Sequence, residues 1–566
     1  MAVIQGQHVS RALGAVENPM LTVEHDGFVW LQMPIESEAQ RSPGGSTLIW
    51  QFPVSANARV IAGQMARSFF DDVYNRIHIS PTQLALGNLV STQSSPAYVW
   101  NAYLEPRTLV AITGLQEGIA LSGQPAPALN FSALQERIWA VFVTPVGPAV
   151  LDAAVSWAFE NGAVATLRIT GNRVVAFSFA PDWRDGIVER LTWSTDVLQS
   201  PSAAEQRRAL RLAPRREFEA PVLLDGRERQ LFDLAMFGWG AQVWALPIWH
   251  DVQMIEGAAQ GTQLIACVTT HRDFRTGGLA MLRSESAFTY EVVEVEGVAA
   301  GSLSLKRPTQ QPWPAGSRLY PVRTAQLMKA PQMTRLTDQA QRAEVHFLLS
   351  EPPEWLPALP TTLYRGAPVL ELRPNEVEDV SGTWQRLLLE LDSGMALPLL
   401  TDTANRAFPL QSHAWQNLGR AEQATYRSLL YALRGRQKAL WLPTHANDLT
   451  LVDAVTPSAT TFDIAAIGYT RFASARPGRR DIRLEFWDGS VLHRRITGSA
   501  EIGGEVERLV LDAAFGRPVA PADLHRISWM MLARLDQDAI EIQHETDAEG
   551  VSKSHVVFRG VRDDEL

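Results

Sequence analysis

The chain has 566 residues, of which 46% are hydrophobic and 20% are charged, so it can form several folded cores and is not globally disordered. At roughly 100–200 residues per domain, this length predicts about three to five domains. The 51 basic and 61 acidic residues give a net charge of -10, which argues against nucleic-acid binding, because such binding depends on lysine and arginine at phosphates.

A single cysteine, Cys267, excludes an internal disulfide and any metal site built from several cysteines. It lies in the apolar run 264–268, which predicts a buried, inert thiol rather than a nucleophile. The first residues lack the basic flank and apolar stretch of a signal peptide, and no run of 18 apolar residues predicts a membrane helix. We therefore expect a soluble protein that is made and kept, or assembled, in a reducing cytoplasm.

Most of the chain has the pattern of β-strands. Residues 164–169 and 481–487 alternate between apolar and polar side chains, the period of two that half-buried strands require. Hairpin-type turn signals occur at 170–173, 296–297 and 488–490. The sequence therefore predicts a mainly β, multidomain fold with a few short helices.

The segment 78–180 predicts a two-sheet sandwich, because short strands follow one another at near-regular spacing over about 100 residues. It contains P-x-x-L-x-L-G-x-x-V at 81–90, then V-W-N at 99–101 and I-x-G at 169–171. This order resembles the immunoglobulin-like domains of the major-sperm-protein type. The resemblance implies a domain that binds or scaffolds rather than one that catalyses.

Two helices are predicted further along the chain. The first covers 203–210, where Ser202 followed by Glu205 fits a capping box. The second runs from Arg420 to Leu433 and has one apolar face. Five arginines near the first helix predict a solvated helix face, with protein–protein contact as the first alternative and nucleic-acid contact as the second; they are Arg207, Arg208, Arg211, Arg215 and Arg216.

The remainder of the chain contains an internal duplication. Residues 234–237 and then 243–252 are similar to residues 430–433 and then 439–449. Four strands follow in the same order in each copy: 281–283, 290–293, 319–323 and 343–347 in the first, and 484–486, 493–496, 527–529 and 554–558 in the second. We expect two homologous β-rich units that share one topology.

The predicted organisation therefore has five parts. Residues 1–77 form an N-terminal β-rich region, and residues 78–180 form the immunoglobulin-like sandwich. The first β-rich unit covers 181–350 and the second covers 378–566. Residues 351–377, which include a proline-rich stretch, are predicted to be a semi-rigid linker and lead-in.

The spacings that mark common active sites are not found in the sequence. There is no phosphate-binding G-x-x-x-x-G-K-[ST] loop, no H-E-x-x-H zinc motif and no G-x-S-x-G nucleophile elbow. Gly238 and Gly240 begin a dinucleotide-type pattern, but Val243 stands where its third glycine should be.

Two weaker constellations occupy corresponding places in the duplicated units, just after a proline: His250 with Asp251, and His445 with Asp448. A histidine near a carboxylate can bind a metal or exchange protons. The alternative is that the aspartate caps a turn after a strand. We favour the alternative, because a duplicated fold keeps structural signatures in both copies, whereas catalysis usually needs one site.

A glycan-cleaving site would need two carboxylates about 5–9 Å apart, and the 17 tryptophans could line its cleft. Most of these tryptophans, such as Trp100 and Trp529, lie in strand positions beside apolar residues, which favours the core, and no acid pair stands out. We therefore predict no catalytic residue, no cofactor-binding residue and no metal ligand, and hence a protein that is not an enzyme and has no cofactor.

Three segments resemble tail proteins of long-tailed bacteriophages. They are 189–200 leading into 205–218, then 426–443, and then 532–547. The resemblance implies a structural component of the tail tip, or baseplate, most similar to a distal tail protein. A baseplate hub protein and a carbohydrate-binding or carbohydrate-cleaving tail protein are the alternatives within that group, and a host scaffolding protein is the alternative outside it.

The resemblance also implies partners and a location. A distal tail protein forms a ring, for which a hexamer is the first expectation and a trimer the second. Its neighbours are the tail tube, tape-measure and hub proteins, with no nucleic acid and no membrane insertion. The expected location is the tail tip of the virion, after assembly in the host cytoplasm.

Overall fold

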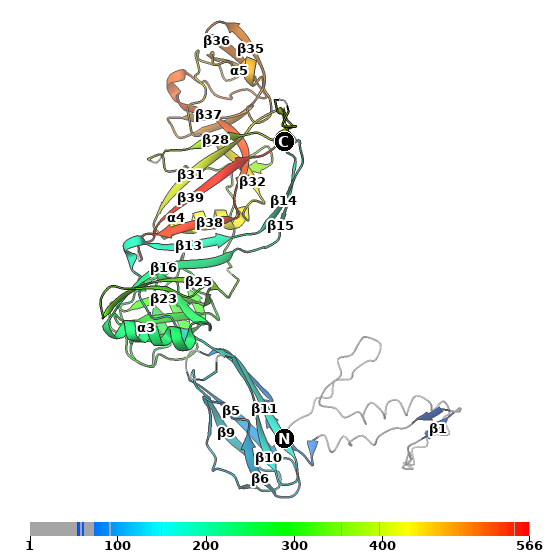
Figure 1. Cartoon of the computed structure of the whole chain (residues 1–566), viewed down its shortest axis with the longest axis vertical. Helices are drawn as coiled ribbons and strands as arrows, with labels where there is room; N and C mark the ends of the chain where they lie inside the picture. The colour runs from blue at the N-terminus through cyan, green and yellow to red at the C-terminus, as the bar shows by residue number, and fades with distance from the viewer. Residues whose placement is uncertain are drawn as a thin grey trace. The chain divides into compact units, whose positions relative to one another are not determined.

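The computed structural model of the protein describes residues 54–56, 59–61, 73–89, 92–145, 147–148, 150–352, 354–377, 379–395, 397–547 and 549–564. It is mainly β with few helices, as the sequence predicts. The chain divides into two compact units, Met1–Val174 and Val175–Leu566 (Figure 1). Over the described stretches, none of the helices combines the length and the apolar character that crossing a membrane requires.

The first unit contains two sheets besides a short hairpin of β1 (Val54–Ala56) and β2 (Arg59–Ile61). One sheet has the order β3 (Ile77–Ser80), β5 (Gln93–Asn101), β9 (Glu136–Val143) and β7 (Ile119–Ser122). The other has the order β4 (Gln83–Leu89), β11 (Val164–Arg173), β10 (Val150–Phe159), β6 (Arg107–Thr113) and β8 (Leu129–Phe131).

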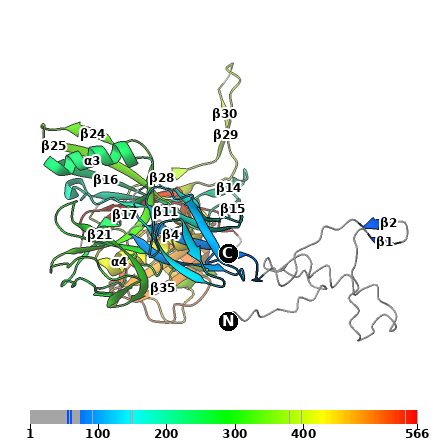
Figure 2. The ribbon, with the colours of Figure 1, turned by 90° about the horizontal axis from the view of Figure 1, so that it is seen from below.

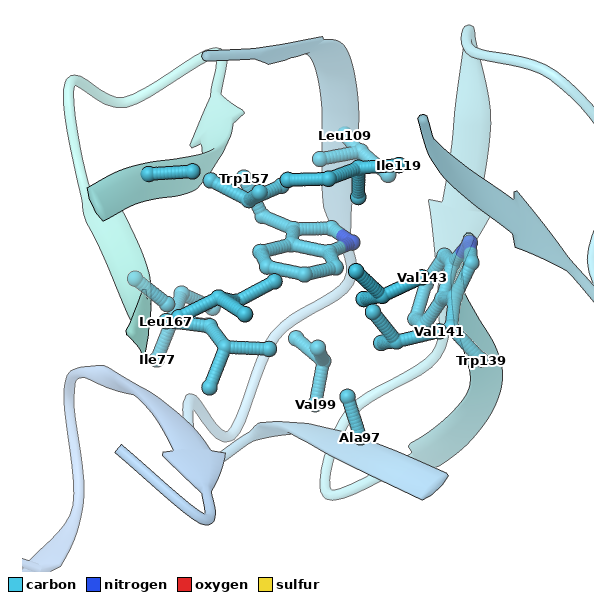
Figure 3. Packing of buried hydrophobic residues seen from close by; sticks show 14 of the residues in the cluster. Ile77, Ala97, Val99, Leu109, Ile119, Trp139, Val141, Val143, Trp157 and Leu167 are labelled. Atoms are coloured by element: carbon cyan, nitrogen blue, oxygen red, sulfur yellow. The ribbon is translucent and has the colours of Figure 1, made fainter. Parts of the chain in front are cut away.

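The core of the first unit lies between these two sheets. Trp139 from β9 meets Trp157 from β10 edge to face, with 5.9 Å between ring centroids, and Figure 3 shows Trp157 at the centre of the surrounding apolar side chains. The side chains of β10 alternate between buried and exposed, which is the pattern of a strand with one face on a core. Two packed sheets agree with the sandwich predicted for 78–180; the likeness to an immunoglobulin-like domain stays a prediction.

The second unit begins with short elements and then forms the first of two repeats. We call residues 187–349 repeat 1. Its lead-in contains β12 (Val175–Ala176) and the 3-10 turn η3 (Trp183–Asp185). Its elements are β13 (Ile187–Thr192), β14 (Thr195–Gln199), β15 (Glu205–Ala209), β16 (Arg215–Asp225), α3 (Gly226–Trp239), β17 (Trp244–Pro247), η4 (Trp249–Asp251), β18 (Gln253–Met254), β19 (Leu264–Ala266), β20 (Leu279–Arg283), β21 (Tyr290–Ala299), β22 (Ser302–Leu305), β23 (Arg318–Leu327), β24 (Gln332–Arg335) and β25 (Ala340–Leu349).

After the small hairpin of β26 (Leu363–Tyr364) and β27 (Ala367–Pro368), the second repeat follows. We call residues 382–560 repeat 2. Its elements are β28 (Gly382–Gln385), β29 (Leu388–Leu391), β30 (Leu399–Asp402), β31 (Phe408–Leu418), α4 (Arg420–Leu433), β32 (Ala439–Pro443), β33 (Thr461–Ala465), α5 (Tyr469–Phe472), β34 (Asp481–Phe486), β35 (Val491–Gly503), β36 (Val506–Leu511), η5 (Pro521–Asp523), β37 (Leu524–Leu535), β38 (Ala539–His544) and β39 (Val551–Gly560).

The two repeats share one topology, as the duplication in the sequence predicts. The pairings of β16 with β25, β17 with β23 and β20 with β21 recur as β31 with β39, β32 with β37 and β34 with β35. The duplication also reaches further toward the N-terminus than its sequence signal. The hairpin register Thr195↔Ala209 in β14–β15 recurs in β29–β30 as Leu388↔Asp402, both residues 193 positions further along.

The two predicted helices have opposite outcomes. The helix from Arg420 to Leu433 is confirmed as α4. The helix over 203–210 is wrong, because this segment forms β15, which pairs with β14. The Glu205 side chain bonds Arg534 of β37 instead of closing a capping box, and Ala203 has a φ of 65°, which no right-handed helix allows.

The arginines near that segment therefore do not form a solvated helix face. Arg207 lies on β15 and is partly buried, and Arg216 lies on β16 and is only 3% exposed. The helix α3 of repeat 1, in turn, was not among the predicted helices.

Candidate functional site

The predicted pair His250 and Asp251 lies in η4 and is buried. The Asp251 carboxylate accepts a hydrogen bond from Arg420 Nη1 of α4 at 2.5 Å and another from the backbone amide of Asp273 at 3.0 Å. The His250 ring stacks on the ring of His544 from β38, with 3.7 Å between centroids and 4° between planes. The structure thus places this pair of repeat 1 directly against repeat 2.

The corresponding pair of repeat 2 has a different environment. The Asp448 carboxylate accepts hydrogen bonds from the hydroxyl of Thr444 and, at 2.8 Å, from the backbone amide of Trp529. Burial, together with the neighbouring His413, lowers the pKa of His445 to about 3, so its ring is neutral at physiological pH. These bonds hold a turn beside β37, which is the structural interpretation that we favoured from the sequence.

The centre of the contact between repeats is a residue that sequence reasoning missed, Glu189 of β13, which is fully buried. Its carboxylate accepts hydrogen bonds from Arg216 Nε at 2.5 Å, Arg427 Nη2 at 2.5 Å and His544 Nε2 at 2.8 Å. Burial alone would raise the pKa of Glu189, but the guanidinium groups of Arg216 and Arg427 outweigh it and hold the pKa well below its usual range.

A second buried acid extends this arrangement. Asp273 accepts a hydrogen bond from Arg216 Nη1 and another from Arg323 Nη2, each at 2.5 Å. Burial opposes ionisation, but the two arginines lower the pKa of Asp273 to about 2. We call the whole set the junction network; its members are Glu189, Arg216, His250, Asp251, Asp273, Arg323, Arg420, Arg427 and His544.

Three members of the junction network have the donor atoms of a metal site. The ligand atoms of Glu189, His250 and His544 lie within 4.8 Å of one another, and a carboxylate with two imidazoles is a donor set that zinc accepts. The Glu189 carboxylate, however, is already bonded to two guanidinium groups. An entering cation would meet these two fixed positive charges at close range, so the charges favour a lock between repeats over a metal centre.

The strand β13 joins the repeats through the backbone as well. Leu191 lies opposite Arg216 of β16 on one edge and opposite Ile540 of β38 on the other edge, so β13 belongs to both repeats. Just after β13, Trp193 continues the contact with repeat 2. Its ring packs edge to face on Tyr431 of α4, with 5.9 Å between ring centroids.

The hairpin β14–β15 then lies along repeat 2. Glu205 of β15 accepts two hydrogen bonds from the guanidinium group of Arg534 in β37, both at 2.8 Å. At the other end of the hairpin, Thr195 donates to the carboxylate of Asp538 at 2.8 Å through both its amide and its hydroxyl. Repeat 1 thus holds repeat 2 with a strand, a buried ionic network and a hairpin arm.

Repeat 2 has counterparts of the three strands β13, β14 and β15, namely β28, β29 and β30. In the described part of the chain, β28 forms a strand ladder only with β31, and β29 and β30 form one only with each other. Trp384 of β28 is 60% exposed, whereas its register counterpart in β13, Leu191, is fully buried. Figure 2 shows the hairpin β29–β30 extending away from the sheets of its own unit.

Two other features bear on function. A cavity of about 920 Å³ lies beside α4 and is lined by apolar side chains such as Trp355 and Leu359 together with Arg272, Arg275 and Glu354. Cys267 is partly buried rather than buried as the sequence predicts, and it packs against an apolar cluster of repeat 1. This partial burial raises the pKa of its thiol to about 11. The thiol is therefore protonated at physiological pH, as an inert cysteine should be.

No protein-family model matches the chain, and no curated protein matches it either.

Proposed function

We propose that the chain is a structural component of a bacteriophage tail tip, of the distal tail protein type, and that it acts by assembly rather than by turnover. The resemblance of 189–200, 426–443 and 532–547 to phage tail proteins supports the class of protein. The observation that carries the assembly role is the second copy of the clamping device, β28 with the hairpin β29–β30, which has no strand partner in the described residues outside its own repeat.

The composition of this hairpin supports an assembly role. Leu389, Leu391 and Leu399 lie on one face of the hairpin and are all exposed by more than 60%. Burying a leucine side chain contributes about 1.5–3 kcal/mol, and a two-stranded hairpin by itself is only marginally stable in water. A hairpin of this kind is therefore most stable when another protein surface covers it.

The partners follow from the proposed class: further copies of the chain, then the tail tube, tape-measure and hub proteins at the tail tip. A baseplate hub protein would use the same kind of assembling surface. A ring and a hub differ in their neighbours and in the number of copies, and both would act without a catalytic centre.

The proposal is tested on phage particles whose genome encodes this chain. An antibody raised against the purified full-length protein is used for immunogold electron microscopy, with serum taken before immunisation as the control. We expect label at the end of the tail that carries the receptor-binding parts. Label confined to the lysate, with none on purified particles, would overturn the proposal.

A further inference from the structure

The outer edge of repeat 1 has the same form as the surface that β13 occupies on repeat 2. Met333 of β24 pairs with Ala343, and Ile542 of β38 pairs with Ser554. Met333 and Ile542 therefore occupy corresponding positions in the two repeats. Their partners Ala343 and Ser554 lie opposite Val222 of β16 and Trp415 of β31, and Trp415 is 193 positions after Val222, the same shift as between the two hairpins.

The two corresponding edges differ in what covers them. The other edge of β38 carries β13, whereas in the described residues β24 forms a ladder only with β25. Ile542 is accordingly 3% exposed and Met333 is 51% exposed. An uncovered strand edge with an apolar side chain is a surface on which another strand can add.

The helices beside these edges show the same difference. Seven residues of α4 are buried, among them Arg427 and Tyr431, which contact Glu189 and Trp193 of repeat 1, whereas only Phe232 of α3 is buried. Leu234 and Phe237 of α3 are 70% and 93% exposed. Repeat 1 thus presents an open receiving surface, made of β24 and α3, and repeat 2 presents an open clamping surface, made of β28, β29 and β30.

We propose that these two surfaces bind each other between copies of this chain, so that β28 of one copy pairs antiparallel with β24 of the next. This inference rests on the proposed assembly role and specifies its contact. Within one chain, β13 and β38 form the pairs Glu189↔Ile542 and Leu191↔Ile540. When each residue is replaced by its counterpart in the other repeat, the pairs between copies become Gly382↔Met333 and Trp384↔Pro331. Trp384 then takes the place beside α3 that Leu191 has beside α4.

The chemistry of the two surfaces is complementary. Counted from Gly226 and Gly419, the two glycines that follow β16 and β31 with positive φ, Leu234 and Arg427 are both eight residues along. By this count Leu234 takes the place of Arg427 and not of Leu430, with which the sequence similarity aligns it. The internal ion pair Glu189–Arg427 is therefore replaced between copies by Gly382 beside Leu234, so that a small residue faces an apolar one.

A second ionic contact is replaced in the same way. Gln326 and Arg534 correspond, because they lie opposite Leu348 in β25 and Arg559 in β39. Glu205 of the first hairpin corresponds to Pro398 of the second by the shift of 193 residues. The pair Glu205–Arg534 thus becomes Pro398 beside Gln326, which is again uncharged.

This difference gives the contact its specificity. A clamping surface with Glu189 would keep Arg216 of its own repeat but lose Arg427 if it bound the receiving surface around Leu234, and losing part of this compensation for a buried carboxylate is unfavourable. The uncharged clamping surface carries no such penalty. The contact is head to tail, with different surfaces on the two copies, so association continues until a ring closes or a filament forms.

Two single variants of the full-length protein test the contact. Trp384→Asp changes the clamping surface and leaves the receiving surface intact, and Phe237→Asp does the reverse; both residues are exposed within one chain, although the Trp384 ring also contacts Arg479 of its own chain, 4.6 Å from the ring centroid. Each variant should weaken self-association at least about a hundredfold, as expected for a large apolar residue at the centre of an interface. Size-exclusion chromatography with light scattering measures the mass, and Trp487→Asp, at a tryptophan exposed elsewhere, is the matched control that should associate like the wild type.

Mixing the two variants distinguishes this contact from other kinds of association. Each variant keeps one intact surface, so an equimolar mixture should form heterodimers and nothing larger. Formation of the heterodimer also shows that both variants are folded. Three results would each overturn the proposed contact. They are a wild-type protein that stays monomeric, a Trp384→Asp variant that associates as strongly as the wild type, and a mixture of the two variants that forms no heterodimers. Particle labelling decides the tail-tip role separately, so the two proposals can fail independently.

Discussion

At the scale of single residues, Glu189 is held as an ion inside the protein by its neighbours. It loses the water that would stabilise its charge, and it receives hydrogen bonds from Arg216, Arg427 and His544 in return. Replacing a whole buried ion pair with apolar residues is often harmless, but removing one partner leaves the others buried and unpaired. The carboxylate is therefore needed because of the two arginines around it.

Replacing Glu189 with glutamine should lower the free energy of unfolding by about 3–5 kcal/mol, the usual loss when one partner of a buried pair is removed. Urea unfolding of the full-length protein measures it. The control is Glu541→Gln on the neighbouring strand, because Glu541 also bonds an arginine, Arg190 at 2.7 Å, but its side chain is 59% exposed. That variant should lose about 1 kcal/mol or less; equal losses in the two variants would contradict a special role for Glu189.

His413 predicts how stability depends on pH. It is fully buried, neither ring nitrogen has a hydrogen-bond partner in the described residues, and burial lowers its pKa from 6.5 to about 4. His413 therefore becomes protonated below about pH 6.5 in the unfolded chain, but only below about pH 4 in the folded chain. The stability contribution is complete above pH 6.5 and falls by up to about 3 kcal/mol as the pH decreases to 4.

The variant His413→Leu should remove one proton from this dependence. Between pH 6.5 and 4, the slope of unfolding free energy against pH should decrease by about 1.4 kcal/mol per unit. Urea titrations at several pH values measure the slope, and the same pair of proteins at pH 8 provides the control for packing. An unchanged slope would show that His413 is protonated inside the folded protein.

At the scale of elements, the sequence predicts types of structure better than it predicts contacts. The apolar face of 420–433 identifies α4 correctly, because an amphipathic helix packs on one side wherever it lies. The segment 203–210 is rich in residues that favour helices, yet it forms β15, because pairing with β14 and the bond from Glu205 to Arg534 decide its structure. Contacts with distant residues override local preference there.

The candidate site shows the same limit. The positions of His250 and Asp251 stand out in the sequence, whereas Glu189 is a charged residue in a predicted strand, and charged residues are almost never fully buried unless they are paired. Its burial depends on β38, which lies more than 300 residues later, and no local pattern reports that pairing. The repeat of β14–β15 as β29–β30 was also missed, because the two hairpins share a register and not their residues.

At the scale of the whole molecule, the two compact units should unfold as separate cooperative transitions. Trp157 lies at the centre of the first unit's core and is fully buried. Trp157→Ala should destabilise that unit by about 3–5 kcal/mol and leave the other transition in place. Differential scanning calorimetry measures both transitions, and a shift of both by the same amount would show that the units unfold together.

The strand β13 also sets the order in which the molecule can be completed during synthesis. Its residues 187–192 leave the ribosome about 350 residues before their partners in β38, which at about 5–20 residues per second corresponds to about 20–70 s. Arg427 follows Glu189 by 238 residues and His544 follows it by 355, so Glu189 gains its three partners one after another, and one edge of β13 stays open until β38 is made. Repeat 1 is therefore completed only when the last strands have been made. Until then, the free edge of β13 can be occupied either by β38 of the same chain or by a strand of a neighbouring molecule.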